Sequence, residues 1–198
     1  MKALMVDVDG VVVTSPDGRL WNWNAMVDIG LDPLVFQAKF FEPHWQDLVL
    51  GRADLHDRLG PVLTEIAPHL TSQQVSDYWF ANDAHLDHAL LADLATLRAS
   101  GIPIYLATVQ EHYRARYLWD VLGLSECFDG MFYAAELGAA KPDPCFYLEI
   151  ESRSGFSAAE LTLLDDRMDN VYAARACGWG GVHWDGTQGL FKTLDFPR

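Results

Sequence analysis

Short apolar runs and helix-like stretches alternate along most of the chain. The first run, residues 3–6, lacks the apolar/polar alternation of a half-exposed strand, which is typical of a strand buried on both faces of a parallel sheet. Strands that alternate with helices predict an α/β fold with a doubly wound, Rossmann-like parallel sheet. The expected strands are 3–6, 102–107, 130–133, 161–164 and 181–184, and the expected helices between the later strands are 90–99, 111–122, 142–152 and 168–177.

Residues 14–88 interrupt this alternation. They are rich in aromatic residues and helix signals and contain no apolar strand run. Asp32, followed by a proline, marks the start of a helix that reaches about residue 41. Asp54 starts a second helix through about residue 66, and either Thr71 or Ser72 caps a third through about residue 81. We therefore expect an inserted, all-helical segment.

The chain accordingly divides into two expected domains. A Rossmann-like catalytic core comprises residues 1–13 and 89–198, and an all-helical cap comprises residues 14–88. With 198 residues, half of them hydrophobic, the chain is long enough for one domain with an insertion.

Charge and cysteine content limit the partners and the compartment. The formal net charge of −14 argues against nucleic acid and gives no reason to expect a membrane surface. It would also repel anionic substrates at long range, so a phosphate ligand needs a local metal ion or lysine. The three cysteines are scattered without C-x-x-C spacing, as expected of reduced thiols, and no apolar run approaches the length of a membrane helix. We expect a soluble, cytoplasmic protein; its oligomeric state is left open.

Polar residues with catalytic potential follow the expected strands. In a parallel sheet the carboxyl ends of the strands meet at one edge, where open α/β sheets bind ligands. Residues distant in sequence should therefore lie together there. They are Asp7 with Asp9, Thr108, Lys141, and Asp165 with Asp166.

Phosphoryl transfer suits these residue types. A carboxylate can attack phosphorus and form an aspartyl-phosphate, while a second carboxylate moves protons. Neighbouring carboxylates supply the oxygen ligands that Mg²⁺ prefers. A hydroxyl and an ammonium group can neutralise the charge on the transferred group.

These residues, in this order, resemble the motifs of the haloacid dehalogenase superfamily. Residues 7–11 (DVDGV) match its first motif, Thr108 its second, Lys141 before a proline its third, and residues 163–170 (LLDDRMDN) its fourth. The form of the fourth motif resembles that of one branch of the superfamily, which has a small helical cap and includes the phosphatase domain of soluble epoxide hydrolases. The resemblance covers essentially the whole chain and implies Mg²⁺ as cofactor and a small phosphorylated molecule as substrate.

The resemblance also implies roles for the first three motifs. Asp7 would be the nucleophile and a magnesium ligand. Asp9 would be the general acid/base, with its backbone carbonyl bound to the metal, and its presence distinguishes phosphatases from dehalogenases. Thr108 and Lys141 would hold the phosphoryl oxygens.

In the fourth motif, Asp166 would bind magnesium directly and Asp165 through water, while Asn170 would orient the loop. Without a cation, two acids after a buried strand are hard to justify structurally.

One position departs from the family pattern. The second motif of this branch is usually Thr-Asn or Ser-Asn, whereas here Val109 follows Thr108 at the expected phosphate-binding position. Loss of one preorganised donor can cost about 3 kcal/mol of transition-state stabilisation. Gln110 is a possible substitute donor. Activity that is slow, or tuned to a particular substrate, is the expected consequence.

The expected cap offers possible substrate contacts. Its aromatic residues are expected to form the cap's own core, although Trp21, Trp23 and Trp45 are also possible pocket residues. Arg52 is either a surface arginine or a substrate contact. Residues 85–88 (HLDH) are expected at a solvated helix start rather than in a metal site.

The sequence therefore predicts a magnesium-dependent phosphohydrolase of a small phosphorylated metabolite, acting through an aspartyl-phosphate. A phosphomutase is one alternative, although the expected cap has few basic residues with which to hold a second phosphate. A catalytically weakened phospho-ligand-binding protein is another, which Val109 favours. A dehalogenase is disfavoured by Asp9.

Overall fold

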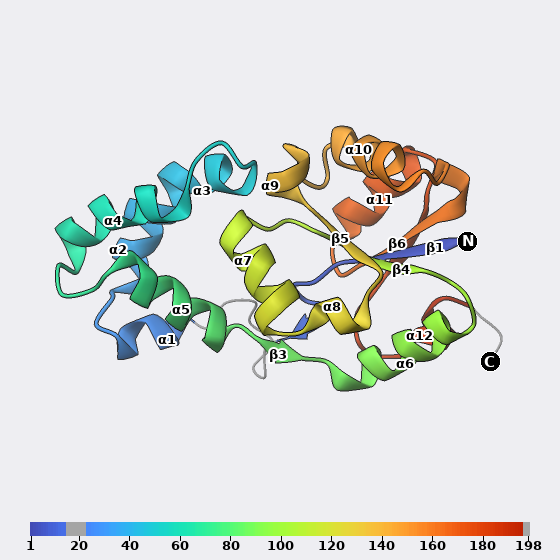
Figure 1. Cartoon of the computed structure of the whole chain (residues 1–198), viewed down its shortest axis with the longest axis horizontal. Helices are drawn as coiled ribbons and strands as arrows, with labels where there is room; N and C mark the ends of the chain where they lie inside the picture. The colour runs from blue at the N-terminus through green and yellow to red at the C-terminus, as the bar shows by residue number, and fades with distance from the viewer. Residues whose placement is uncertain (15–22, 196–198) are drawn as a thin grey trace.

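The computed structural model of the chain describes residues 1–14 and 23–195, with residues 23–25 described by their backbone alone. Its centre is a five-stranded parallel sheet in the order β5-β4-β1-β6-β7 (Figure 1). The predicted α/β fold class is confirmed. The strands are β1 (Ala3–Val6), β4 (Ile104–Thr108), β5 (Gly130–Tyr133), β6 (Leu161–Asp165) and β7 (Gly180–His183).

The strand order places the start of the chain at the middle of the sheet. After β1 the chain builds β4 and β5 on one side, and then returns to build β6 and β7 on the other. The point where this order reverses, at the carboxyl end of β1, is where such sheets bind ligands. Val6 lies opposite Leu106 of β4 and Leu164 of β6. This register brings the residues that follow each strand to the same level.

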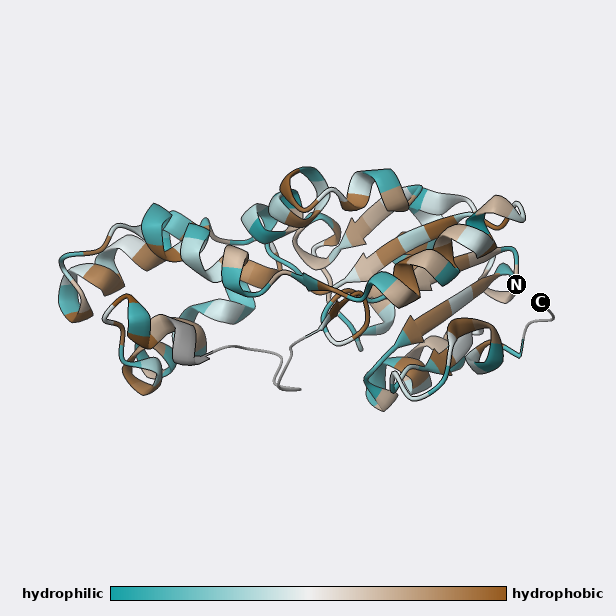
Figure 2. Ribbon diagram, turned by 90° about the horizontal axis from the view of Figure 1, so that it is seen from below, coloured by the Kyte–Doolittle hydropathy of each residue, from teal (hydrophilic) through white to brown (hydrophobic). Residues whose placement is uncertain are grey.

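Both faces of the sheet are covered by helices (Figures 1 and 2). Leucines of α6 (His88–Ala99), α8 (Leu124–Cys127) and α12 (Leu190–Thr193) are buried against one face. The other face is covered by α9 (Ala134–Leu137), α10 (Pro144–Ser154) and α11 (Met168–Ala176). All four residues of β1 are buried, as expected of a central strand between two helical layers.

Residues 23–82, which lie between β1 and β4 along the chain, consist of helices and the turns that connect them, and these helices lie together on the left of Figure 1. We call residues 23–82 the helical insertion. It has its own buried cluster, to which Phe36, Phe40, Phe41, Trp79 and Phe80 contribute, so the predicted internal core is confirmed for these aromatics. The helices are α1 (Trp23–Asp28), α2 (Pro33–Phe36), a π-helical segment η1 (Gln37–Phe41), α3 (Glu42–Val49), α4 (Leu55–Ile66) and α5 (Ser72–Asn82).

Helix starts in the insertion were predictable from their caps. Asp32, Asp54 and Thr71 each accept hydrogen bonds from backbone N–H groups of the first turn that follows. Thr71, rather than Ser72, is the cap of α5. The helix that begins after Asp32 does not end near residue 41 as expected, because η1 leads directly into α3.

The predicted helix start at residues 85–88 is wrong in its first half. His85 and Leu86 form a short strand, β3 (His85–Leu86), that pairs antiparallel with β2 (Val13–Thr14). The following helix, α6, begins at His88, where the Asp87 side chain accepts from the N–H of Leu90. Backbone hydrogen bonding to β2 outweighs the local preference of residues 85–86 for a helix start. The sequence alone does not reveal this pairing with a distant strand. We call the pair of β2 and β3 the β2–β3 ribbon. The expected domain boundaries at 13/14 and 88/89 lie at or beside this ribbon, and the division itself stays a prediction.

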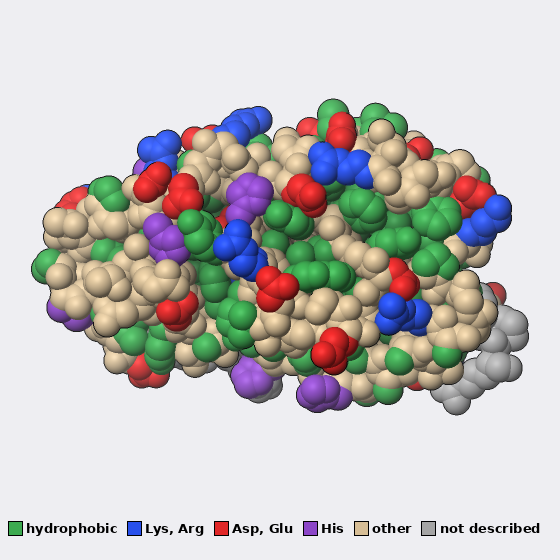
Figure 3. All heavy atoms as spheres, viewed as in Figure 1, with side chains coloured by type: hydrophobic (Ala, Val, Ile, Leu, Met, Phe, Trp, Pro, Cys, Tyr) green, Lys and Arg blue, Asp and Glu red, His purple; other side chains and the backbone are tan. Residues whose placement is uncertain are grey.

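Surface charges are dispersed on the face drawn in Figure 3. Among the described residues, basic side chains on this face lie singly beside acidic ones and form no continuous patch. No described helix has the length and apolar character needed to span a bilayer.

Candidate active site

A tight loop after β1 carries the first two acidic residues. The N–H of Asp7 donates to the carbonyl of Leu164 at 2.9 Å, which ties the end of β1 to β6. Gly10 has a φ of +82°, a left-handed conformation that favours glycine, and its N–H donates to the carbonyl of Val13. The chain therefore turns back immediately after Asp9, which leaves both carboxylates at the edge of the sheet.

Lys141 connects the acidic residue after β1 with the acidic pair after β6. It lies in the loop before α10, and its side chain is 1% exposed. Its Nζ is 2.9 Å from Oδ1 of Asp7 and 2.6 Å from Oδ2 of Asp165. Burial acts to lower the pKa of Lys141, but the two carboxylates outweigh it and the pKa is raised. The ammonium group is thus held charged between two acids.

The nucleophile candidate has an unusual electrostatic environment. Burial is the largest influence on Asp7 and raises its pKa from 3.8 to about 7. Asp165 and Asp9 add to this increase, while Lys141 opposes it. A buried carboxylate beside other acids is a frequent feature of functional sites.

The acidic pair after β6 has two different environments. Asp165 is fully buried, and its oxygens accept from Lys141 Nζ, from the Asn170 side-chain amide and from the Arg167 N–H. Oδ1 of Asp166 and Oδ1 of Asn170 are buried without a hydrogen-bond partner. Unpaired buried oxygens are costly unless a cation or another donor reaches them.

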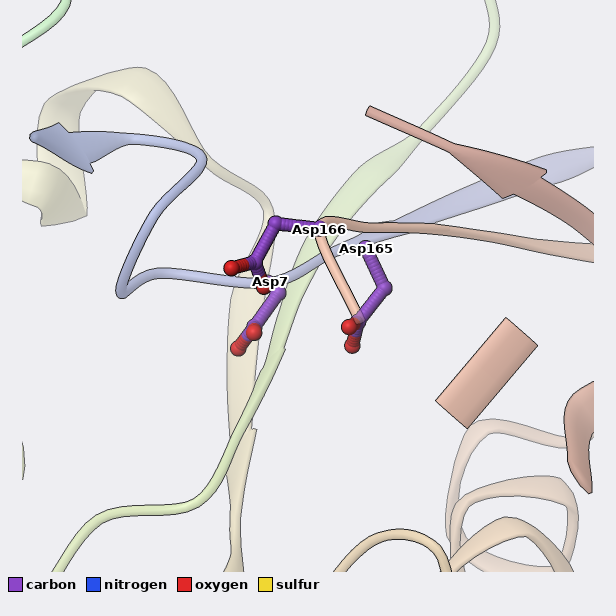
Figure 4. A group of neighbouring side chains, drawn as sticks. All are labelled: Asp7, Asp165 and Asp166. Atoms are coloured by element: carbon purple, nitrogen blue, oxygen red, sulfur yellow. The ribbon is translucent and has the colours of Figure 1, made fainter. Parts of the chain in front are cut away.

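These oxygens fit a divalent metal ion. Ligand atoms of Asp7, Asp165 and Asp166 lie within 4.8 Å of one another. In Figure 4, Asp7 extends from the loop after β1, and the two other acids extend from the end of β6. Because Asp165 is already occupied by several donors, Asp7 and Asp166 are the better direct ligands. An all-oxygen set of this kind suits Mg²⁺.

A pocket of about 220 Å³ opens over these groups. The helical insertion contributes Trp45 from α3, and the loop after β4 contributes Val109. Both side chains also pack against the apolar cluster on this side of the sheet. The pocket is lined by Asp7, Asp9, Trp45, Val109, Lys141, Asp166, Arg167 and Asn170.

Several residues singled out in the sequence do not line the pocket or lie outside the described residues. Thr108 is fully buried at the end of β4 and is not among the residues that line the pocket. Arg52 is exposed and does not line it either, which favours a surface position. Trp21 lies outside the described residues, as does the side chain of Trp23.

Two buried polar residues lie near the site. Gln110 was named from the sequence only as a substitute donor, and Arg114 was not identified. Gln110 donates from Nε2 to Oδ2 of Asp9 at 2.6 Å. Arg114 is 2% exposed and donates to the carbonyls of Phe80 and Asp83 at the end of α5. The polar stretch after an apolar strand was a usable signal for Gln110. Arg114 is buried because the end of α5 lies against it. The residues next to Arg114 in the sequence give no indication of this contact.

The family model of haloacid dehalogenase-like hydrolases matches residues 1–178. The chain belongs to this family. The resemblance inferred from the four motifs is thereby confirmed at the level of the family, and the chain is an enzyme of a hydrolase family.

Named relatives of the hydrolase family extend the comparison. The chain is 27% identical over 190 residues to the sesquiterpene phosphatase astK of Aspergillus oryzae, covering 92% of this chain and 89% of that protein. It is 34% identical over 103 residues to flavin mononucleotide hydrolase 1 of Arabidopsis thaliana, covering 51% of this chain and 41% of that protein.

Solved structures of the family share the fold. The enzyme bt-2542 of Bacteroides thetaiotaomicron, in complex with magnesium and inorganic phosphate, matches with a TM-score of 0.80 at 16% identity, covering 96% of this chain and 97% of that one. The L-2-haloacid dehalogenase of Xanthobacter autotrophicus matches with a TM-score of 0.62 at 18% identity, covering 92% of this chain and 77% of that one.

Proposed function

We propose that this hydrolase is a magnesium-dependent phosphomonoesterase that acts through an aspartyl-phosphate on Asp7. The observation that carries the proposal is the convergence of Asp7, Lys141 and Asp166 on one pocket. The relative named as a sesquiterpene phosphatase supports the same reaction class. Asp9, which lines the pocket two residues after Asp7, favours phosphate ester hydrolysis over dehalogenation.

The residues would act in two steps. An oxygen of Asp7 attacks phosphorus, the bond from phosphorus to the ester oxygen breaks, and Asp9 gives a proton to the leaving oxygen. Asp9 then takes a proton from water as the water attacks phosphorus, which releases phosphate and restores Asp7. Lys141 keeps Asp7 oriented and balances negative charge, because its ammonium group already contacts that carboxylate.

Asp7 and Asp166 would hold the magnesium ion, with Asp165 and Asn170 supporting them. When bound, Mg²⁺ would neutralise charge on the phosphoryl oxygens. Asn170 fixes Asp165 through its amide, which leaves its own Oδ1 available near the metal.

The walls of the pocket favour an ester with an apolar part in its alcohol. Trp45 and Val109 place apolar surface beside the acids, and no basic residue of the described insertion lines the pocket. A phosphomutase needs cations for a second phosphate, so this lining favours a phosphatase. The two named relatives, a sesquiterpene phosphatase and a flavin mononucleotide hydrolase, carry names that point to chemically different substrates.

The test is phosphate release from 4-nitrophenyl phosphate with Mg²⁺ and with excess EDTA. We expect turnover that requires Mg²⁺ and that Asp7→Asn lowers by more than ~1000-fold, because the nucleophile is lost. Asp57→Asn, at an exposed position in α4, is the matched control and should leave turnover unchanged. Undiminished turnover in Asp7→Asn would refute the proposal.

A further inference from the structure

Gln110 is a buried side chain that contacts the proposed acid/base, Asp9, and the reaction scheme above gives it no role. It is 3% exposed, and its Nε2 donates to Oδ2 of Asp9 at 2.6 Å. The same nitrogen lies 3.4 Å from Oγ1 of Thr108. A neutral amide buried this deeply, with its donor directed at one carboxylate oxygen, holds that carboxylate in a defined orientation.

The position of Gln110 is fixed on both sides along the chain. Its backbone carbonyl accepts from the N–H of Ala135, which ties it to α9. The next residue, Glu111, caps α7 (His112–Arg116) by accepting from the N–H groups of Tyr113 and Arg114. The side-chain amide therefore projects from an anchored backbone, and its contact with Asp9 does not depend on a flexible loop.

A second core residue supports the same carboxylate from further away. The buried guanidinium of Arg114 lowers the pKa of Asp9 and so opposes burial, which is the largest influence on that group and raises it. Arg114 makes its direct contacts with the end of α5, at Phe80 and Asp83, rather than with Asp9. Gln110, by contrast, donates directly to the Asp9 side chain.

We propose that Gln110 is a positioning residue that holds Asp9 in the orientation from which it protonates the leaving oxygen. Its amide binds Oδ2, and this leaves Oδ1 of Asp9 to act on the substrate. The inference rests on the proposed phosphatase function. It also explains how the chain functions with Val109 at the pocket wall, because the donor that this position lacks is supplied by the next residue, acting on Asp9.

Leaving-group dependence separates this role from a structural one. An ester of 4-nitrophenol has a good leaving group and needs little protonation, whereas 2-phenylethyl phosphate releases a poor one and depends on the general acid. We expect Gln110→Met, which keeps the length and removes the donor, to lower kcat/KM for the alkyl ester by about 10- to 100-fold. The same variant should lower kcat/KM for the aryl ester by less than about 3-fold.

Controls keep the outcome interpretable. Gln188→Met, at an exposed position, should change neither value, and Gln110→Ala is the second variant in case the methionine packs poorly. Because Gln110 is inferred to act through Asp9, Asp9→Asn should show the same selectivity for the aryl ester. Adding Gln110→Met to Asp9→Asn should then change the ratio of the two substrates no further.

Each outcome decides between the two proposals. Equal losses on both substrates, or a raised inhibition constant for inorganic phosphate in Gln110→Met, would overturn the positioning role while leaving the phosphatase intact. A wild-type chain that releases phosphate from neither ester would refute the proposed function, and the inference with it. A selective loss on the alkyl ester that disappears in the Asp9→Asn background would support the inference.

Discussion

Replacement of Lys141 by methionine is the most direct test of how the site is held together. The methionine keeps most of the volume of the lysine but removes a charge that is 1% exposed and that contacts Asp7 and Asp165 at 2.9 and 2.6 Å. Breaking a buried ion pair by removing one partner costs about 3–5 kcal/mol, because it leaves uncompensated buried charge. Here two carboxylates lose their cation, so we expect a loss of unfolding free energy at the upper end of that range.

The surface pair of Lys39 and Glu65 provides the control. Its atoms are also 2.6 Å apart, but the side chains are 51% and 62% exposed. Exposed pairs of this kind contribute about 0–1 kcal/mol. Lys39→Met should therefore have little effect.

Urea unfolding at pH 8 in excess EDTA would measure both variants. A loss of about 3–5 kcal/mol corresponds to about 6–20 °C in melting temperature for a chain of this size. Added Mg²⁺ should restore part of the stability of Lys141→Met, because it supplies positive charge beside Asp7. A Lys141→Met variant that is no less stable than Lys39→Met would refute the electrostatic account of the site.

Three further predictions concern the metal ion, the packing of the insertion and pH. Asp166→Asn should weaken Mg²⁺ binding by about 10-fold or more, measured as the concentration that produces half of the thermal stabilisation; an unchanged midpoint would exclude Asp166 as a ligand. Gly51→Ala should lose about 1–3 kcal/mol more stability in urea than Gly123→Ala. Both glycines have positive φ, but only at Gly51 would a Cβ lie 2.3 Å from a backbone carbonyl, that of Ala135, and equal losses would contradict this contact. Burial raises the pKa of Asp83 from 3.8 to about 6, so the folded chain binds this proton more tightly than the unfolded chain, and stability should fall as pH rises from about 4 to 6. This part of the pH dependence should be absent in Asp83→Asn, and its persistence there would assign it to another group.

The parallel sheet and its acidic edge were accessible from the sequence for physical reasons. Apolar runs without alternation are typical of buried parallel strands, and Asp7 and Asp165 each come at the end of one. Because parallel strands align their carboxyl ends, the pattern that identified the strands also predicts that Asp7 and Asp165 lie at the same edge of the sheet. Caps such as Asp54 act within one helical turn and are therefore readable locally.

The remaining features depend on contacts between distant segments. The ribbon of β2 and β3 pairs Val13 with Leu86, and the residues around each of them give no indication of the distant partner. Likewise, sequence alone indicates only that Gln110 is polar. Its role follows from Asp9, which lies 101 positions away along the chain. The sequence left several tryptophans as possible pocket residues. Trp45 lines the pocket because α3 packs against the edge of the sheet, and the sequence alone does not show this packing.

The β2–β3 ribbon has a mechanical consequence. Both crossings between the sheet and the helical insertion are hydrogen-bonded to each other there, since β2 carries the outgoing chain and β3 the returning one. The chain therefore enters and leaves the helical insertion at one ribbon, and the other attachments of the insertion are non-covalent, such as the packing of Trp45 and Val49 of α3 against the core. The position of Trp45 at the entrance above the acids therefore depends on this packing as well as on the ribbon.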